Sequence, residues 1–164
     1  MKPKSLLFYF AFALGTNVYT TNGQVNEQDS LAVVNLYNST KGPNWNNHTN
    51  WLTHSPVSTW YGITVTNKRV TEIALQFNGL NGSIPVSIGD LTKLTFLSLV
   101  GSRLTNIPSS LGNLTNLIEL DLSVTGLSGS IPSSFGKLVN LFSFAGVSSI
   151  TLCVSYGTRR IANL

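Results

Sequence analysis

Hydrophobic residues recur at a fixed step along the middle of the chain. Three consecutive units, Val70–Lys93, Leu94–Asn116 and Leu117–Asn140, are 24, 23 and 24 residues long, and a fourth begins at Leu141. Each unit opens with the spacing apolar-x-x-apolar-x-apolar, whose last two apolar residues stand two apart, as in a strand with one buried face. A constant period of this length indicates that one structural unit is stacked several times.

Each unit is predicted to be a short strand, a turn and an extended return. The strand residues predicted to point inward are Val70, Ile73 and Leu75, then Leu94, Leu97 and Leu99, then Leu117, Leu120 and Leu122. The Ile-Pro pair after each turn should be extended, because proline fixes φ and has no amide donor. The second unit is one residue short before its Ile-Pro, so we expect a local irregularity in that coil.

The residues between and after these inward positions are predicted to form one open face of a short parallel sheet. They are Glu72, Ala74, Gln76 and Phe77; Phe96, Ser98, Val100 and Gly101; and Glu119, Asp121, Ser123 and Val124.

The repeated pattern resembles the plant-type leucine-rich repeat, L-x-x-L-x-L-x-x-N-x-L-x-G-x-I-P-x-x-L-G-x-L-x-x, throughout residues 70–140. The resemblance implies an α/β fold, a short leucine-rich-repeat solenoid whose parallel strands line a concave sheet that is the usual partner surface. The family's asparagine is present as Asn78 but is replaced by Ser102 and Thr125, so we expect an incomplete asparagine ladder between the second and third coils. On this basis the residues assigned to ligand binding are Glu72, Gln76, Phe77, Phe96, Ser98, Val100, Glu119, Asp121 and Ser123.

Residues 24–69 are predicted to cap the first end of the solenoid, which would otherwise expose an apolar cross-section. Asn26 or Asp29 could cap a helix that carries Leu31, Val34 and Tyr37 and stops at Gly42-Pro43. Three tryptophans follow, Trp45, Trp51 and Trp60. They either bury the end of the solenoid or, as the alternative, expose Trp45 and Trp51 for stacking on a carbohydrate.

The cap also resembles the N-terminal region of extracellular leucine-rich-repeat proteins, in which the phrase W-x-G-V-x-C precedes the first repeat. Here the phrase reads Trp60-Tyr-Gly-Ile-Thr-Val, with Val65 in the place of the cysteine. Cys153 is the single cysteine of the chain, so no internal disulfide is expected.

The two ends of the chain differ in how clearly they can be interpreted. Lys2 and Lys4 precede the apolar run Leu6–Leu14, so residues 1–23 are predicted to be a secretory signal peptide, too short to span a bilayer. Residues 141–164 are interpreted as a degenerate fourth repeat or C-terminal cap. Ile150, Leu152, Val154 and Tyr156 alternate with polar residues and predict one more strand. This region is either an atypical closing coil or the truncated remnant of a longer receptor-like array.

Composition narrows the class of function. The net charge of +4 falls to +2 without Lys2 and Lys4 (8 Lys and Arg against 6 Asp and Glu), and the remaining basic residues are scattered, which argues against nucleic-acid binding. His48 and His54 have no neighbouring metal ligands, and no catalytic serine phrase occurs, so neither a metal, a cofactor nor an enzymatic activity is predicted. Glu119 and Asp121 are interpreted as a solvated acidic patch. Candidate N-glycosylation sequons start at Asn38, Asn47, Asn81 and Asn113.

The sequence therefore predicts a secreted or cell-surface module that binds a protein or peptide on its strand face. The alternatives are a cell-surface carbohydrate binder and a fragment of a longer receptor-like protein. Three coils give a sheet of only about 15 Å across, so binding by this face alone should be weak.

Overall fold

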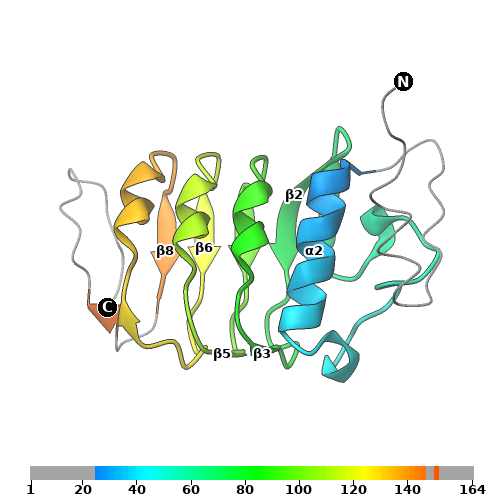
Figure 1. The fold of residues 1–164 in the computed structure, drawn as a ribbon, viewed down its shortest axis with the longest axis horizontal. Coiled ribbons are helices and arrows are strands. Elements are labelled where there is room, and N and C mark those ends of the chain that lie inside the picture. The colour runs from blue at the N-terminus through cyan, green and yellow to red at the C-terminus, as the bar shows by residue number, and fades with distance from the viewer. Residues whose placement is uncertain (1–24, 147–149, 152–164) are drawn as a thin grey trace.

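Strands from four successive units pair side by side in parallel and form the main sheet of the protein. They are β2 (Arg69–Ala74), β4 (Phe96–Ser98), β6 (Glu119–Asp121) and β8 (Ser143–Ala145). The computed structural model describes residues 25–146 and 150–151. Its units stack along one axis with the strands on one side and the helical segments on the other (Figure 1). The predicted α/β solenoid is confirmed.

A fifth strand, which the sequence analysis did not anticipate, begins the sheet. Strand β1 (Ile63–Thr66) pairs antiparallel with β2, so the sheet order is β1-β2-β4-β6-β8. The two strands are joined by Asn67 and Lys68, whose φ values are 50° and 63°. Two consecutive positive φ values are the geometry of a type I′ hairpin turn, which favours asparagine at its first central position.

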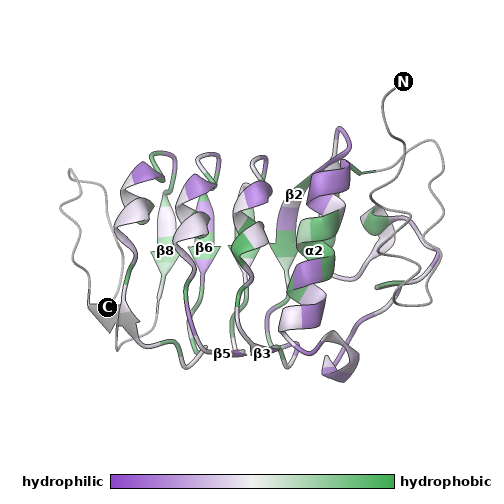
Figure 2. Cartoon of the chain, in the orientation of Figure 1, coloured by the Kyte–Doolittle hydropathy of each residue, from purple (hydrophilic) through white to green (hydrophobic). Residues whose placement is uncertain are grey.

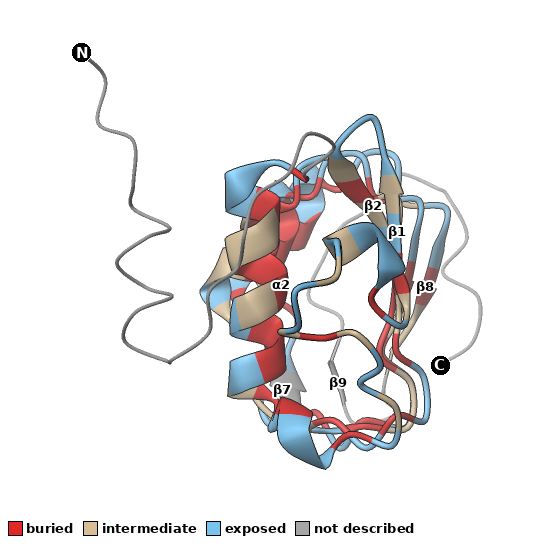
Figure 3. Ribbon diagram, turned by 90° about the vertical axis from the view of Figure 1, so that its right-hand side faces the viewer, coloured by how far each residue is buried: buried red, intermediate tan, exposed pale blue. Residues whose placement is uncertain are grey.

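The inward positions of the repeats form a continuous core. All nine residues predicted to point inward from the three strands are 0% exposed. Viewed along the axis of the solenoid, buried residues occupy the interior between the sheet and the helical layer (Figure 3). The spacing of apolar residues therefore predicted the side chains of this core correctly.

The helical layer consists of one α-helix followed by three short 3₁₀ segments. These are α2 (Glu27–Ser39), η3 (Val86–Asp90), η4 (Ser109–Asn113) and η5 (Ser133–Lys137), each packed against the next (Figure 1). Every 3₁₀ segment follows the proline of an Ile-Pro pair, and Pro85 and Pro108 have the extended ψ values 153° and 142°. The predicted extended conformation at these prolines is confirmed. Two further 3₁₀ turns, η1 (Gly42–Asn44) and η2 (Val57–Thr59), belong to the cap.

Helix α2 is capped by Asn26, one of the two caps that the sequence offered. The Asn26 side chain accepts hydrogen bonds from the backbone N–H groups of Gln28 and Asp29, at 3.0 and 3.4 Å. Hydrophilic and hydrophobic residues share the helix (Figure 2). Its buried residues are Asp29, Ala32, Val33, Leu36 and Tyr37. Of the apolar residues expected on this helix, Tyr37 is buried, and Leu31 and Val34 are half-buried, with Val34 packed against the core.

Two separate pairs of very short strands lie along the edge of the solenoid that is at the bottom of Figure 1. Strand β3 (Asn81–Gly82) pairs with β5 (Arg103–Leu104), and β7 (Gly129–Ser130) pairs with β9 (Ile150–Thr151). No pairing joins β5 to β7 among these described strands. The interruption follows the unit that is one residue short, so the expected irregularity is confirmed.

The predicted last strand is described only at β9, and Leu152, Val154, Tyr156 and the predicted signal peptide lie outside the described residues. Within the described part of the chain, no helix has the length and apolar character needed to cross a membrane.

The asparagine position of the repeat has a different role in each coil. Asn78 is buried, donates from Nδ2 to the Asn47 carbonyl at 2.8 Å, and accepts from the Asn47 N–H at 2.7 Å. It therefore ties the cap to the first coil. The buried Ser102 hydroxyl has no hydrogen-bond partner among the described residues, and Thr125 donates to Leu122 in its own coil at 2.6 Å. The expected gap in the ladder is confirmed.

We expect Asn78→Ala to lower the free energy of unfolding by about 2 kcal/mol, because it removes two hydrogen bonds from a buried amide. Ser102→Ala, at the equivalent position of the next coil, should change it by less than about 0.5 kcal/mol, since the hydroxyl it removes is unpaired. Urea unfolding followed by circular dichroism measures both. Equal losses in the two variants would contradict the assignment of the anchoring role to Asn78.

Candidate binding surface

We define the strand face as the outward side of the five-stranded sheet together with the residues that immediately follow each strand. The residues predicted to bind a ligand differ in their exposure there. Glu72, Gln76, Phe77 and Glu119 are exposed, and Phe96, Val100, Asp121 and Ser123 are half-buried. Hydrophilic residues are prominent on β2 and β6 (Figure 2). The strand face thus combines two exposed carboxylates with aromatic and small side chains.

One predicted site residue, Ser98, is not available to a ligand. Its exposure is only 4%, so its assignment to the binding surface is wrong. Ser98 lies in register between Ala74 and Asp121 on the neighbouring strands. Because its side chain is short, the adjacent strands cover it even though it points to the outer side of the sheet.

The register of the sheet brings five outward positions into one row. Glu72 pairs with Phe96, Phe96 with Glu119, and Glu119 with Ser143, while Thr64 of β1 lies opposite Glu72. Thr64 and Ser143 were missed by the sequence analysis. The alternation of apolar and polar residues in Ile63-Thr64-Val65-Thr66 could have predicted that Thr64 faces outward. Phe144, a buried residue of the fourth unit, could have predicted the same for its neighbour Ser143.

The carboxylates of the strand face differ in their hydrogen bonding. Oε2 of Glu72 accepts one hydrogen bond, from the Thr64 hydroxyl at 3.0 Å. Oδ1 of Asp121 accepts two from Ser123, from the backbone N–H at 2.9 Å and from the hydroxyl at 2.6 Å. Asp121 is thus held against its own strand end by Ser123. Glu72 and Glu119 are the carboxylates with most of their acceptor positions open to solvent.

Phe77 lies at the edge of the strand face rather than within the row. Its side chain is 67% exposed, and its φ is 53°. The Asn46 side chain donates to its carbonyl oxygen at 2.9 Å, which holds this left-handed residue against the cap. The neighbouring coil has Gly101 at the equivalent position, and a Cβ atom there would collide with the Phe77 ring.

The three tryptophans of the cap are buried, which confirms the interpretation that they bury the end of the solenoid; the alternative, in which Trp45 and Trp51 are exposed for a carbohydrate, is wrong. Each is 3% exposed, and Trp60 is 4% exposed. Trp51 stacks on Tyr37 with ring centroids 5.5 Å apart and contacts Trp60 at 4.8 Å. The three indole N–H groups donate to the carbonyl oxygens of Thr40, Tyr61 and Ser55. Burial in this cluster also raises the pKa of the Tyr37 hydroxyl.

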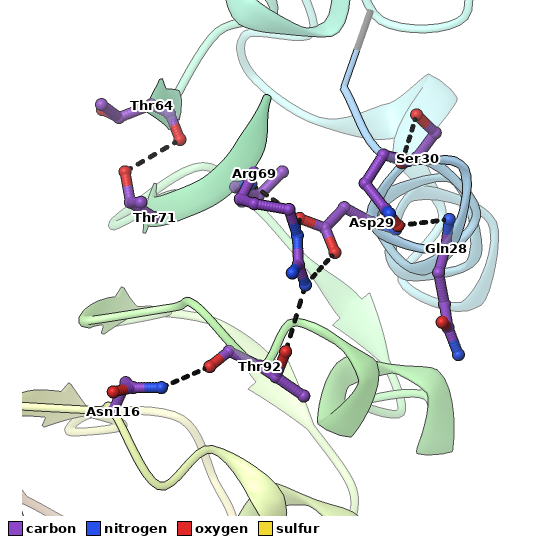
Figure 4. A network of polar contacts seen from close by, with 10 residues as sticks. Gln28, Asp29, Ser30, Thr64, Arg69, Thr71, Thr92 and Asn116 are labelled. Atoms are coloured by element: carbon purple, nitrogen blue, oxygen red, sulfur yellow. Dashed lines mark hydrogen bonds and ion pairs between the residues drawn. The ribbon is translucent and has the colours of Figure 1, made fainter. Parts of the chain in front are cut away.

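An ion pair between the buried Asp29 and the half-buried Arg69, not anticipated from the sequence, joins the cap helix to the first strand of the repeats. Nε and Nη2 of Arg69 donate to the two carboxylate oxygens of Asp29 at 2.9 Å each, and the Val70 N–H donates to the same carboxylate at 2.8 Å (Figure 4). Nη2 of Arg69 also donates to the Thr92 hydroxyl at 3.1 Å. Hydrogen bonding to Asp29 and its negative charge raise the pKa of the Arg69 guanidinium, against the opposing effect of burial. This network positions β2, and hence Glu72, relative to the cap.

Other predicted site residues are scattered. Asn38 and Asn113 are exposed, whereas Asn47 and Asn81 are half-buried. Glycosylation at these positions remains a prediction. Within residues 25–146 and 150–151, no group of His, Cys, Asp and Glu side chains could hold a metal ion.

Comparisons with known proteins agree with this architecture. A family model described as Leucine Rich Repeat matches residues 116–138. The leucine-rich repeat protein FLOR 1 of Arabidopsis thaliana is 33% identical over 108 residues, which cover 62% of this chain and 32% of FLOR 1. The chain spans about a third or less of the length of the curated relatives it matches.

Two solved structures extend the comparison to three dimensions. The crystal structure of the BIR3–SERK2 complex from Arabidopsis thaliana contains a chain that is 30% identical, with a TM-score of 0.61 over 76% of this chain and 70% of that one. The crystal structure of PEPR1–AtPEP1 contains a chain that is 27% identical, with a TM-score of 0.62 over 77% of this chain and 18% of that one.

Proposed function

This chain belongs to the plant-type leucine-rich-repeat family, and we propose that it is a secreted, non-enzymatic module that binds a protein or peptide on its strand face. The observation that carries the proposal is the row Thr64, Glu72, Phe96, Glu119 and Ser143. It places polar, acidic and aromatic side chains from five adjacent strands on one outward surface.

Two of the similar structures support a partner of this kind, because one is of a complex of BIR3 with SERK2 and the other is of PEPR1 with AtPEP1. Export is proposed from the signal peptide predicted at residues 1–23. The proposal that the module is non-enzymatic is supported by the open setting of its acidic side chains, since solvated carboxylates on a sheet face lack the desolvation that tunes catalytic acids and bases.

The size of the strand face limits what it can bind. With strands about 4.8 Å apart, five strands give a row on the order of 20 Å across. A stable protein–protein interface uses roughly 20 to 30 residues on each side, more than this row provides. A short extended peptide, or a protruding segment of a larger protein, therefore fits the strand face better than a broad globular surface.

We expect Phe96→Ala to weaken the binding of peptides selected from an unbiased display library by about ten-fold, because Phe96 is the aromatic residue at the centre of the row. Val86→Ala provides a matched control. Val86 is 73% exposed on η3, in the helical layer, so its loss should change affinity by less than about two-fold. Fluorescence anisotropy with the purified mature protein measures both effects.

If the selected peptides bind Phe96→Ala, Glu72→Ala and the wild type with equal affinity, the strand face is not the binding surface. Circular dichroism of each variant separates a loss of binding from a loss of folding.

A further inference from the structure

The row of outward residues on the strand face has a regular chemical order. Glu72 and Glu119 lie on the two strands that flank Phe96 and are in register with it. Because neighbouring strands are about 4.8 Å apart, the backbones at the two glutamates are separated by about 10 Å, with the aromatic ring between them.

The charges on this face are of one sign. The chain has 6 Asp and Glu residues in all, and three of them, Glu72, Glu119 and Asp121, are on the strand face. The described basic residues lie elsewhere: Lys41, Lys68 and Lys93 in loops, Arg103 on β5 and Lys137 on η5, while Arg69 is paired with the buried Asp29. The strand face is therefore negative even though the whole chain carries a net positive charge.

The two glutamates that flank the ring keep unused acceptor capacity. The Glu72 carboxylate accepts a single hydrogen bond from a neutral hydroxyl, and among the described residues the Glu119 carboxylate makes no hydrogen bond or ion pair. An ionised carboxylate can accept about four hydrogen bonds, and bonds from a cationic donor are the stronger ones. The half-buried Phe96 ring offers an apolar contact between these two acceptors.

We infer that the ligand of the strand face is an extended peptide carrying two lysine or arginine residues four positions apart. This inference rests on the proposed function. Side chains two and four positions apart project from the same face of an extended chain, which advances about 3.3 Å per residue, so four positions span about 13 Å. The long side chains of lysine and arginine can converge from this span to the separation of about 10 Å between Glu72 and Glu119. One cation then pairs with each glutamate, and an apolar residue between them contacts Phe96. A phosphorylated or acidic segment is repelled by the same carboxylates.

Synthetic eight-residue peptides test the charge and the spacing together. One carries two lysines four positions apart around a central leucine, a second carries the same residues with the lysines adjacent, and a third has glutamine in place of both lysines. Fluorescence anisotropy with the purified mature protein should give the tightest binding for the first peptide. That binding should weaken as salt rises, because the carboxylates are exposed to solvent.

Single replacements of glutamate by glutamine test whether Glu72 and Glu119 each bind one of the two cations. Glu72→Gln and Glu119→Gln should each weaken the spaced-lysine peptide by about three-fold, the range expected of an exposed ion pair. Glu27→Gln, an exposed carboxylate on α2, is the matched control and should leave the affinity unchanged. Equal binding of the lysine and glutamine peptides, or equal losses in all three variants, would overturn the inference.

The inference and the proposed function fail in different ways. If library-selected peptides lack paired cations and lose affinity in Phe96→Ala but not in the two glutamine variants, the cationic ligand is wrong and the strand face remains the binding surface. If Phe96→Ala and Glu72→Ala also leave the affinity for the selected peptides unchanged, the proposed function itself is wrong.

Discussion

Replacing Asp29 with asparagine is expected to lower the free energy of unfolding by about 3 kcal/mol, because the neutral amide loses the charge-assisted hydrogen bonds that the fully buried carboxylate accepts from Arg69 and Val70. Asp29 is 0% exposed and accepts hydrogen bonds from the Arg69 guanidinium and from the Val70 N–H. The asparagine side chain has nearly the same volume, so the loss reports the charge and the bidentate geometry rather than a cavity. Equilibrium urea unfolding measures the difference.

Glu27→Gln is the control for this prediction, because Glu27 is an exposed acid in the same first turn of α2. It should change the free energy of unfolding by less than about 0.5 kcal/mol. A loss below about 1 kcal/mol in Asp29→Asn would show that the aromatic cluster, rather than the ion pair, joins the cap to the repeats.

Gly112→Ala is expected to destabilise the protein by about 2 to 3 kcal/mol, because overpacking at a close contact forces the backbone to shift. Gly112 lies in η4, where a Cβ atom would collide with the Ser134 carbonyl oxygen at the start of η5. Gly89 has the same relation to Ser110 one coil earlier. These glycines allow adjacent 3₁₀ segments to pack closely in the helical layer. The effect is measurable as a shift in thermal unfolding followed by circular dichroism.

Gly136 occupies the equivalent position of the third unit and provides a matched control. A Cβ atom there would meet nothing within 4 Å among the described residues. Gly136→Ala should raise the free energy of unfolding by about 0.5 kcal/mol, because alanine restricts the unfolded chain. Similar destabilisation by both substitutions would show that the effect comes from the 3₁₀ backbone itself rather than from the packing between coils.

The repeats were predictable because their signal is local. The period of the apolar residues identified the buried strand residues, and the prolines identified the extended segments before each 3₁₀ turn. The exposure of individual face residues was less predictable. Alternation places Ser98 on the outer side correctly, but its burial depends on Ala74 and Asp121, which neighbour it only after the coils are in register.

The exposure of the cap tryptophans also depends on tertiary contacts. Three tryptophans within a short stretch are compatible with a buried cluster and with an exposed carbohydrate site, and composition does not distinguish the two. The structure does, because Tyr37 and the three indoles pack together and every indole N–H finds a carbonyl acceptor. The buried face of the helix that supports this cluster also includes Ala32, Val33 and Leu36, which the sequence pattern did not single out, because a 13-residue helix with few strongly apolar residues carries a weak periodic signal.

By itself the sequence determined the repeating unit, its inward residues, the α/β solenoid and the irregular second coil, because each depends on patterns within one period of the chain. Only the tertiary structure decided the pairing of Asp29 with Arg69, the burial of the tryptophans and the placing of Phe96 between Glu72 and Glu119. The ion pair and the placing of Phe96 join residues about one period or more apart, and their geometry depends on how adjacent coils align. That alignment results from the packing of the whole core and from the backbone hydrogen bonds between strands, which no single segment contains.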